Sequence, residues 1–287
     1  MLPGASVMGD ETSLLPDDEV HIWETHLDSI PRELWRLILS SDEVRVLHRL
    51  RTELVRDRFV GRRIFRRAVL AFYTSLAPQN LVFATNAWGK PVLASGNAGA
   101  KLEFSTASSR DVALLAVTGN MPAGVDLEYL DAGFDFLPLL EGLCSSADLQ
   151  RLSRLPADVQ RAAFFQRWTE LESYGKAVGQ GLSVPWPLQF PDWRPAGGPV
   201  ERTAVVQGHD GIDWWLRSLN LHSEGYCAAL CCRVPPRRIK YFCLQAVADP
   251  RTATEESRFL LRFTPDVQFR VSFRAESDIG RPPSNIR

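Results

Sequence analysis

Acidic residues alternate with apolar residues in one short segment, and this segment constrains the fold more than any other. Residues 124–128 read Gly-Val-Asp-Leu-Glu. In a strand, Asp126 and Glu128 project from one face, about 6–7 Å apart along the chain. Two like charges on one face repel unless a cation lies between them, and such oxygen ligands suit Mg²⁺. The pattern alone is equally consistent with an exposed edge strand that carries two acidic side chains.

A second segment, about 40 residues later, has the apolar spacing of an aromatic-rich helix. Within it, Trp168, Glu172 and Lys176 lie along one stripe, because they are four residues apart. Glu172 precedes Lys176, the favourable order for an ion pair, although an exposed pair contributes only about 0.3–0.5 kcal/mol. The segment ends at Gly179-Gln180-Gly181, which is typical of a left-handed helix cap. We infer that this pair faces a site rather than bulk water.

Two further motifs precede these segments. Residues 88–93 read Trp-Gly-Lys-Pro-Val-Leu, and residues 104–109 read Phe-Ser-Thr-Ala-Ser-Ser. Together with the strand motif at 124–128 and the helix motif from Phe165 to Leu182, they resemble, in this order, the signature of the Sfp-type 4′-phosphopantetheinyl transferases. The resemblance covers roughly residues 20 to 230.

The resemblance implies an α+β fold of two similar halves related by a pseudo-twofold axis. We expect a flexible leader at 1–17, halves at 18–119 and 120–246, and a poorly ordered variable tail at 247–287 with a strand pair within 259–273. The first half is expected to contain a strand at 20–23, two helices between 44 and 76 separated near Val60-Gly61, and strands at 81–83, 102–104 and 112–117. The second is expected to contain a strand at 124–129, helices at 134–141, 145–154 and 157–179, and strands at 202–207, 212–219 and 225–234.

The resemblance also implies an activity. It is the Mg²⁺-dependent transfer of 4′-phosphopantetheine from coenzyme A to a serine of an apo acyl- or peptidyl-carrier protein, with release of 3′,5′-ADP. Asp126, Glu128 and Glu172 would be the metal ligands. Asp126, Glu172 and Lys176 would be catalytic: Glu172, or a water beside it, would take the serine proton, and Lys176 would stabilise the phosphates. Such enzymes serve fatty acid, polyketide, nonribosomal peptide or other secondary metabolite biosynthesis.

Coenzyme A contacts follow from the same resemblance. Nine arginines lie between residues 44 and 67, at positions 45, 49, 51, 56, 58, 62, 63, 66 and 67. They suit phosphate capture, and Arg58, or less securely Arg45, fits the contact to the 3′-phosphate. Gly89, Lys90 and Pro91, with Ser108 and Lys176, complete the expected binding set. The alternatives are a solvated helix face, non-specific nucleic-acid contact, and an ordinary structural turn at Gly-Lys-Pro.

The chain departs from the family pattern at a few positions. Ala107 and Ser108 stand where the family has Ser-His, Ser105 stands in place of Asn, and Leu171 stands in place of Lys. The three carboxylates and Lys176 remain, so we expect a divergent but active enzyme. The alternative is a catalytically weak or inactive member that acts as a carrier-protein- or coenzyme-A-binding module.

Composition argues against other classes of protein. The net charge is −1, and no apolar stretch approaches the length of a membrane span. The first 16 residues lack a basic segment followed by an apolar run, so we expect no secretory signal. The five cysteines lack zinc-ligand spacing, and four of them have hydrophobic surroundings that suit buried thiols in a reducing compartment. We therefore expect a cytoplasmic monomer that binds neither nucleic acid nor membrane.

Overall fold

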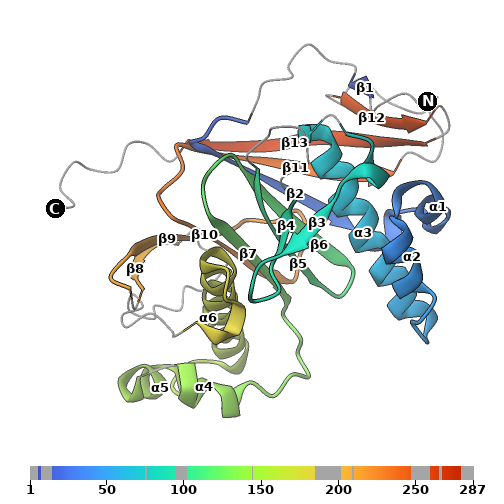
Figure 1. Ribbon diagram of the computed structural model, residues 1–287. Helices are drawn as coiled ribbons and strands as arrows, with labels where there is room; N and C mark the ends of the chain where they lie inside the picture. The colour runs from blue at the N-terminus through green and yellow to red at the C-terminus, as the bar shows by residue number, and fades with distance from the viewer. Residues whose placement is uncertain are drawn as a thin grey trace. The chain divides into compact units, whose positions relative to one another are not determined.

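The structure, a computed structural model, describes residues 6–7, 15–74, 76–94, 102–143, 145–184, 202–208, 210–246, 259–264 and 267–278. The chain forms two compact units (Figure 1). Unit 1 comprises Met1–Asn86, Pro91–Met121 and Pro236–Arg287, and unit 2 comprises Ala87–Lys90 and Pro122–Pro235. Each unit is described by itself below.

Unit 1 contains a seven-stranded sheet with the order β1-β12-β13-β11-β2-β6-β5. The strands are β1 (Ser6–Val7), β2 (Glu19–His26), β5 (Glu103–Ser109), β6 (Val112–Thr118), β11 (Arg238–Ala246), β12 (Phe259–Thr264) and β13 (Val267–Asp278). Neighbouring strands are antiparallel except β11 and β2, which run parallel with Tyr241 opposite Ile22. In Figure 1, β11 lies between β13 and β2. The segment after residue 236 therefore completes the sheet that the N-terminal residues begin.

The core of unit 1 joins this sheet to the helix α3 (Glu53–Thr74). Ile64, Phe65, Ala68 and Val69 of α3 form one cluster with Trp23 of β2, and all five side chains are buried. Their spacing gives α3 an apolar stripe of the kind that packs on a sheet. A small separate sheet pairs β3 (Phe83–Thr85) with β4 (Pro91–Leu93).

Two helices, α2 (Ser41–Leu47) and α3, occupy the region from 44 to 76, as the sequence predicts, but the break between them lies elsewhere. The helices α1 (Trp35–Ile38) and α2 come before α3, with the short 3₁₀ turns η1 (Leu27–Ser29), η2 (Arg32–Leu34) and η3 (Pro78–Asn80) beside them. The break lies at residues 48–52, and the prediction of a break near Val60-Gly61 is wrong. Gly61 lies inside α3, where a Cβ would stand 3.2 Å from Leu27 Cδ2. This glycine allows a close approach and does not stop the helix.

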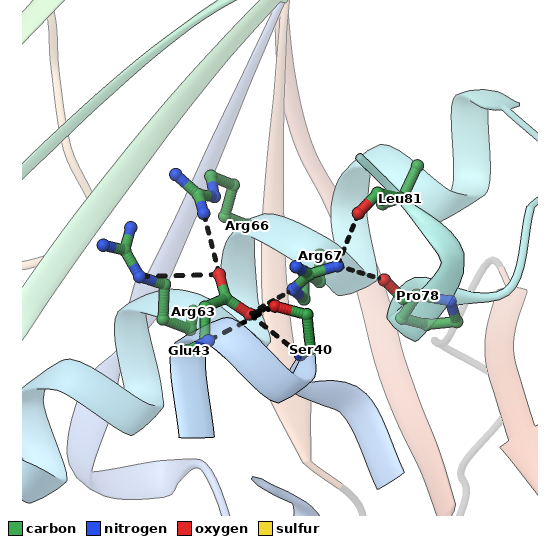
Figure 2. A network of polar contacts seen from close by, with 7 residues as sticks. All are labelled: Ser40, Glu43, Arg63, Arg66, Arg67, Pro78 and Leu81. Atoms are coloured by element: carbon green, nitrogen blue, oxygen red, sulfur yellow. Dashed lines mark hydrogen bonds and ion pairs between the residues drawn. The ribbon is translucent and has the colours of Figure 1, made fainter. Parts of the chain in front are cut away.

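A carboxylate with three arginine partners joins α2 to α3 (Figure 2). Ser40 caps α2 and forms a reciprocal capping box with Glu43. The Glu43 carboxylate lies 3.6 Å from Arg63, 3.0 Å from Arg66 and 2.6 Å from Arg67. Arg67, only 2% exposed, also donates to the carbonyl oxygens of Pro78 and Leu81. Several arginines of this segment therefore hold the fold together.

We expect Glu43→Gln to lower the free energy of unfolding by about 3–5 kcal/mol, because it leaves buried guanidinium groups without their counter-charge. Burial already lowers the pKa of Arg66 to about 10, which shows how poorly this site accommodates an unpaired cation. Glu53→Gln is the matched control: its carboxylate pairs with Arg32 but is 81% exposed, so the change should cost about 1 kcal/mol or less. Urea unfolding of both variants measures the difference, and equal losses would contradict the structural role of Glu43.

Unit 2 contains a four-stranded antiparallel sheet with the order β7-β10-β9-β8. The strands are β7 (Ala123–Tyr129), β8 (Thr203–Gln207), β9 (Asp213–Ser218) and β10 (Tyr226–Cys232). The helix α6 (Ala157–Val178) packs on this sheet and is followed by η4 (Gly181–Ser183), while α4 (Leu137–Leu143) and α5 (Ser146–Leu152) cover the start of α6. Phe164 and Tyr174 of α6 belong to separate buried clusters. The first part of the helix therefore packs against α4 and α5, and its last turns pack against the sheet.

The α+β class predicted from the sequence is confirmed, and so are the three helices and four strands expected between 124 and 234. The expected division at 246 differs from the structure, in which unit 2 ends at Pro235. The reason is that β11 pairs with β2 and so belongs to unit 1. The strand pair predicted within 259–273 is present as β12 and β13. The rest of the predicted tail, and residues 1–5 and 8–14 of the predicted leader, lie outside the described residues. Within the described ranges, no helix combines the length and the apolarity that crossing a membrane requires.

Candidate active site

The strand β7 presents both of its predicted acidic residues toward α6. Gly124, Asp126 and Glu128 alternate along one face of the strand. Gly124 lies so close to α6 that a Cβ there would collide with the backbone of Ser173, Lys176 and Ala177. The same face therefore directs Asp126, only 3% exposed, against the helix. A glycine two residues before the aspartate is what permits this approach.

The helix α6 supplies the other half of the site. Glu172 and Lys176 are half-buried on neighbouring turns, and the helix ends at Gly179, which has the predicted left-handed conformation with φ of 85°. The Lys176 amine donates to Asp126 Oδ1 over 2.5 Å and lies 3.8 Å from Glu172 Oε2. The structure thus brings Asp126, Glu172 and Lys176 together, and the prediction that the Glu172–Lys176 pair lies within a site is consistent with this geometry.

The electrostatics of the site raise the pKa values of two carboxylic acids. Burial raises the pKa of Asp126, although the Lys176 charge and hydrogen bond oppose the shift. Burial also raises the pKa of Glu172, and the negative charges of Asp126 and Glu128 raise it further, against the opposing charge of Lys176. The three carboxylates therefore act on one another, and the positive charge of Lys176 offsets part of their repulsion.

The donor set suits a hard divalent cation. Among the residues that the structure describes, no hydrogen-bond partner reaches the buried Oδ2 atom of Asp126, so this oxygen remains available to a ligand. Across the described ranges, no three His, Cys, Asp or Glu side chains are gathered closely enough to hold a metal ion. The Lys176 amine contacts Asp126 and lies 3.8 Å from Glu172, so it lies close to both carboxylates.

The predicted coenzyme A contacts belong to different parts of the chain. The turn Ala87–Lys90 is in unit 2, where Gly89 has φ of 84° and the Lys90 amine donates to the carbonyl oxygen of Ala123 over 3.2 Å. Lys90 therefore joins this turn to the first residue of β7. Pro91 begins β4 in unit 1.

Arg45, Arg58 and Ser108 are all in unit 1. Arg45 is exposed and pairs with Asp42 of its own helix, so it is not directed at any of the other predicted residues. Arg58 makes two hydrogen bonds with Asp28, of 2.7 and 3.2 Å. Ser108 instead accepts from Arg62, over 3.5 Å. Sequence reasoning did not single out Arg62, which differs from its neighbours in no local pattern. Its contact with Ser108 joins α3 to β5, and these elements are far apart along the chain.

Three of the four departures from the family pattern occupy buried positions, and the fourth, Ser108, is half-buried. Leu171 is 2% exposed, and Ser105 and Ala107 are also buried. A lysine at position 171 would therefore lie on the packed face of α6, and not on the half-buried face that carries Glu172 and Lys176. This packing supports the interpretation that Leu171 is an adapted core residue and not simply a lost phosphate contact.

We expect Leu171→Lys to lower the free energy of unfolding by about 3 kcal/mol, because it replaces a buried leucine with a charge that lacks a partner. Leu137→Lys is the control, since Leu137 is exposed on α4 of the same unit. Melting curves combined with calorimetry of coenzyme A binding provide the measurement. Tighter coenzyme A binding at an unchanged melting temperature would show instead that the lysine reaches a phosphate.

Comparison with known proteins places the chain in a family. A model of the 4′-phosphopantetheinyl transferase superfamily matches residues 122–231. The chain is similar to the 4′-phosphopantetheinyl transferase HetI of Nostoc sp., with 34% identity over 171 residues that cover 59% of this chain and 72% of HetI. It is also similar to a putative 4′-phosphopantetheinyl transferase of Synechocystis sp., with 28% identity over 59% of this chain and 68% of the relative. The transferase psf-1 of Bacillus pumilus is 30% identical over 45% of this chain and 52% of psf-1.

The protein belongs to the 4′-phosphopantetheinyl transferase family and is a transferase. The family match spans β7, α6 and most of β10, and it includes Asp126, Glu128, Glu172 and Lys176. The predicted family membership is therefore confirmed.

Proposed function

We propose that the protein transfers 4′-phosphopantetheine from coenzyme A to a serine of an apo acyl- or peptidyl-carrier protein, in a reaction that requires Mg²⁺. The observation that supports it best is the cluster in which one lysine contacts Asp126 and lies 3.8 Å from Glu172. Acidic ligands with an adjacent amine suit the transfer of a phosphorus-containing group, because such a reaction depends on positioning and charge stabilisation. In this reaction the serine oxygen bonds to the β-phosphorus, the bond to the bridging oxygen breaks, and 3′,5′-ADP leaves.

Asp126, Glu128 and Glu172 would hold the Mg²⁺ ion. The available Oδ2 of Asp126 and the mutual repulsion of the three carboxylates support this assignment. When bound, the ion would neutralise charge on the pyrophosphate of coenzyme A.

Glu172 would accept the proton of the carrier serine. Burial and the neighbouring carboxylates raise its pKa, and a carboxylate with a higher pKa holds an abstracted proton more readily. Glu172 is only half-buried on α6, so its carboxylate is accessible to an incoming hydroxyl.

Lys176 would stabilise the phosphate oxygens and the leaving group. Its ammonium has three donors, and one of them is used by Asp126. The remaining donors are available to a phosphate one turn beyond Glu172.

The test is to incubate the protein with Mg²⁺, coenzyme A and a panel of apo-carrier proteins, and to measure intact masses. We expect one carrier to gain a single phosphopantetheine group only when both Mg²⁺ and coenzyme A are present. Asp126→Asn is the matched control, because it keeps the shape of the side chain but removes its charge, and it should show no transfer. Coenzyme A binding without transfer to any carrier would support a binding module instead.

A further inference from the structure

A buried polar stripe runs along α6 in unit 2, on the side of the helix away from Glu172. Gln166, Glu170 and Ser173 share this stripe, because they are separated by four and three residues. Glu170 and Ser173 are buried, although the packed face of a helix is ordinarily apolar. Glu170 and Glu172 differ by about 200° around the helix axis, so their carboxylates project from opposite sides of α6.

Glu170 belongs to a closed ring of polar contacts. Its carboxylate lies 3.3 Å from Arg167 Nη1 and 4.0 Å from Arg202 Nε. The carbonyl oxygen of Arg202 accepts a hydrogen bond from the backbone of Ser218, and the Ser218 hydroxyl accepts one from Gln166 over 2.5 Å. Gln166 in turn donates to Glu170 over 3.5 Å. The ring therefore joins α6 to the last residue of β9 and to the residue before β8.

The ring also adjoins β10, the strand between β7 and β9 in the sheet. Burial raises the pKa of the Cys227 thiol to about 12, and the negative charge of Glu170 contributes to the shift. At the other edge of the same sheet, Lys176 contacts Asp126 of β7. The helix α6 therefore has polar attachments on both sides: the ring on the side of β8 and β9, and the acidic cluster on the side of β7.

Polar contacts of this kind fix the rotation of a helix more closely than apolar packing does. The hydrophobic effect is non-directional, whereas hydrogen bonds have preferred distances and angles. Arg167 and Glu170 are each only 4% exposed at the side chain, and such an ion pair adds little stability because desolvation offsets the attraction. The contribution of this pair is therefore expected in geometry rather than in stability.

We propose that Arg167 and Glu170 are positioning residues that set the rotation of α6 about its axis. They thereby hold Glu172 at the distance from Asp126 that the reaction requires. This role rests on the proposed function, because the reaction defines the geometry that must be held. A displacement of about 1 Å can lower a rate roughly 10²-fold, so a pair that does not touch the substrate can still control turnover.

The test replaces both charged partners of the full chain with apolar side chains. Arg167→Met combined with Glu170→Met removes the pair without leaving either partner alone, and Arg202 is partly exposed, so the melting temperature should not fall. With Mg²⁺, coenzyme A and an apo-carrier protein, kcat per folded molecule should fall about tenfold or more, while KM for coenzyme A changes less than about twofold. Arg167→Lys, which keeps the ion pair, should keep most of the wild-type rate.

Two further double variants complete the experiment. Asp148→Met combined with Arg151→Met is the matched control, because this pair has the same three-residue spacing on α5 of the same unit and Arg151 is exposed. It should leave kcat and KM unchanged. Gln166→Leu combined with Ser218→Ala removes the uncharged part of the ring, and replacing both partners of a hydrogen bond is well tolerated. It should lower kcat by a smaller factor, and it decides the question if the methionine variant does not fold.

The outcomes separate this inference from the proposed function. Absence of transfer by the wild type to every carrier would overturn both. An active wild type with an unchanged kcat in the ring variants would overturn the positioning role alone, and a lower melting temperature at that unchanged kcat would show a purely structural pair. A higher KM for coenzyme A at unchanged kcat would also overturn it, because the ring would then act on binding and not on the reacting geometry.

Discussion

Glu172→Gln should lower the rate of phosphopantetheine transfer by about 10³-fold or more, while the folded protein becomes no less stable. The rate falls because the proposed proton acceptor and one metal ligand lose their charge together. The free energy of unfolding should not fall, because the raised pKa of Glu172 means that ionisation of this side chain is costly in the folded state.

The pH dependence of that stability follows from linkage. The ordinary pKa of the glutamic acid is 4.5, and its folded-state pKa is higher. As pH rises through the interval between these two values, the unfolded chain loses the proton first, so the wild type loses stability. Glutamine does not titrate, so the melting temperatures of the two proteins should agree near pH 4 and the variant should melt at the higher temperature near pH 7.5.

These measurements need metal-free buffer, followed by addition of Mg²⁺. The ion should raise the melting temperature of the wild type more than that of the variant, because a bound ligand stabilises the folded state. Glu224→Gln is the control, since it removes an exposed carboxylate from the same unit. Normal turnover of Glu172→Gln with Mg²⁺ dependence intact would end the proposed mechanism.

Gly124→Ala should both destabilise the protein and slow transfer. The new Cβ would overlap the α6 backbone between Ser173 and Ala177, so β7 and α6 must move apart. Overpacking of this kind costs about 1–3 kcal/mol. A displacement of about 1 Å can cost roughly 10²-fold in rate, and this one would separate Asp126 from Lys176.

Gly133→Ala provides the comparison, because its Cβ would meet only Asp131 Oδ1 at an ordinary 3.6 Å. Transfer rates measured well below the melting temperature, with circular dichroism to confirm folding, distinguish a displaced site from an unfolded chain. Full activity in Gly124→Ala would show that the distance between β7 and α6 does not control the reaction.

Local patterns in the sequence predicted the parts of the site that lie within one element. Alternation placed Asp126 and Glu128 on one face, and four-residue spacing placed Glu172 and Lys176 on one stripe. Both patterns depend only on the geometry of a strand or a helix. The Gly179 cap could be predicted for the same reason, since left-handed backbone favours glycine.

Long-range contacts account for what sequence reasoning missed. Arg62 meets Ser108, and Glu43 meets three arginines, only after separate elements have packed. Gly61 carries the same local signal as a helix stop, yet its role is set by Leu27, which is distant in sequence. The parallel pairing of β11 with β2 likewise has no local signature, because it joins residues more than 200 positions apart.

That pairing has a consequence for the order in which the chain can fold during synthesis. All the strands of the unit 2 sheet precede residue 236, so its pairing can be complete while later residues are still being added. The unit 1 sheet still lacks β11, β12 and β13 at that stage, and β2 has an open edge. An unpaired edge can bind other extended segments, and domains tend to fold as units when their residues emerge. The half of the protein that is synthesised first is therefore the last to be finished.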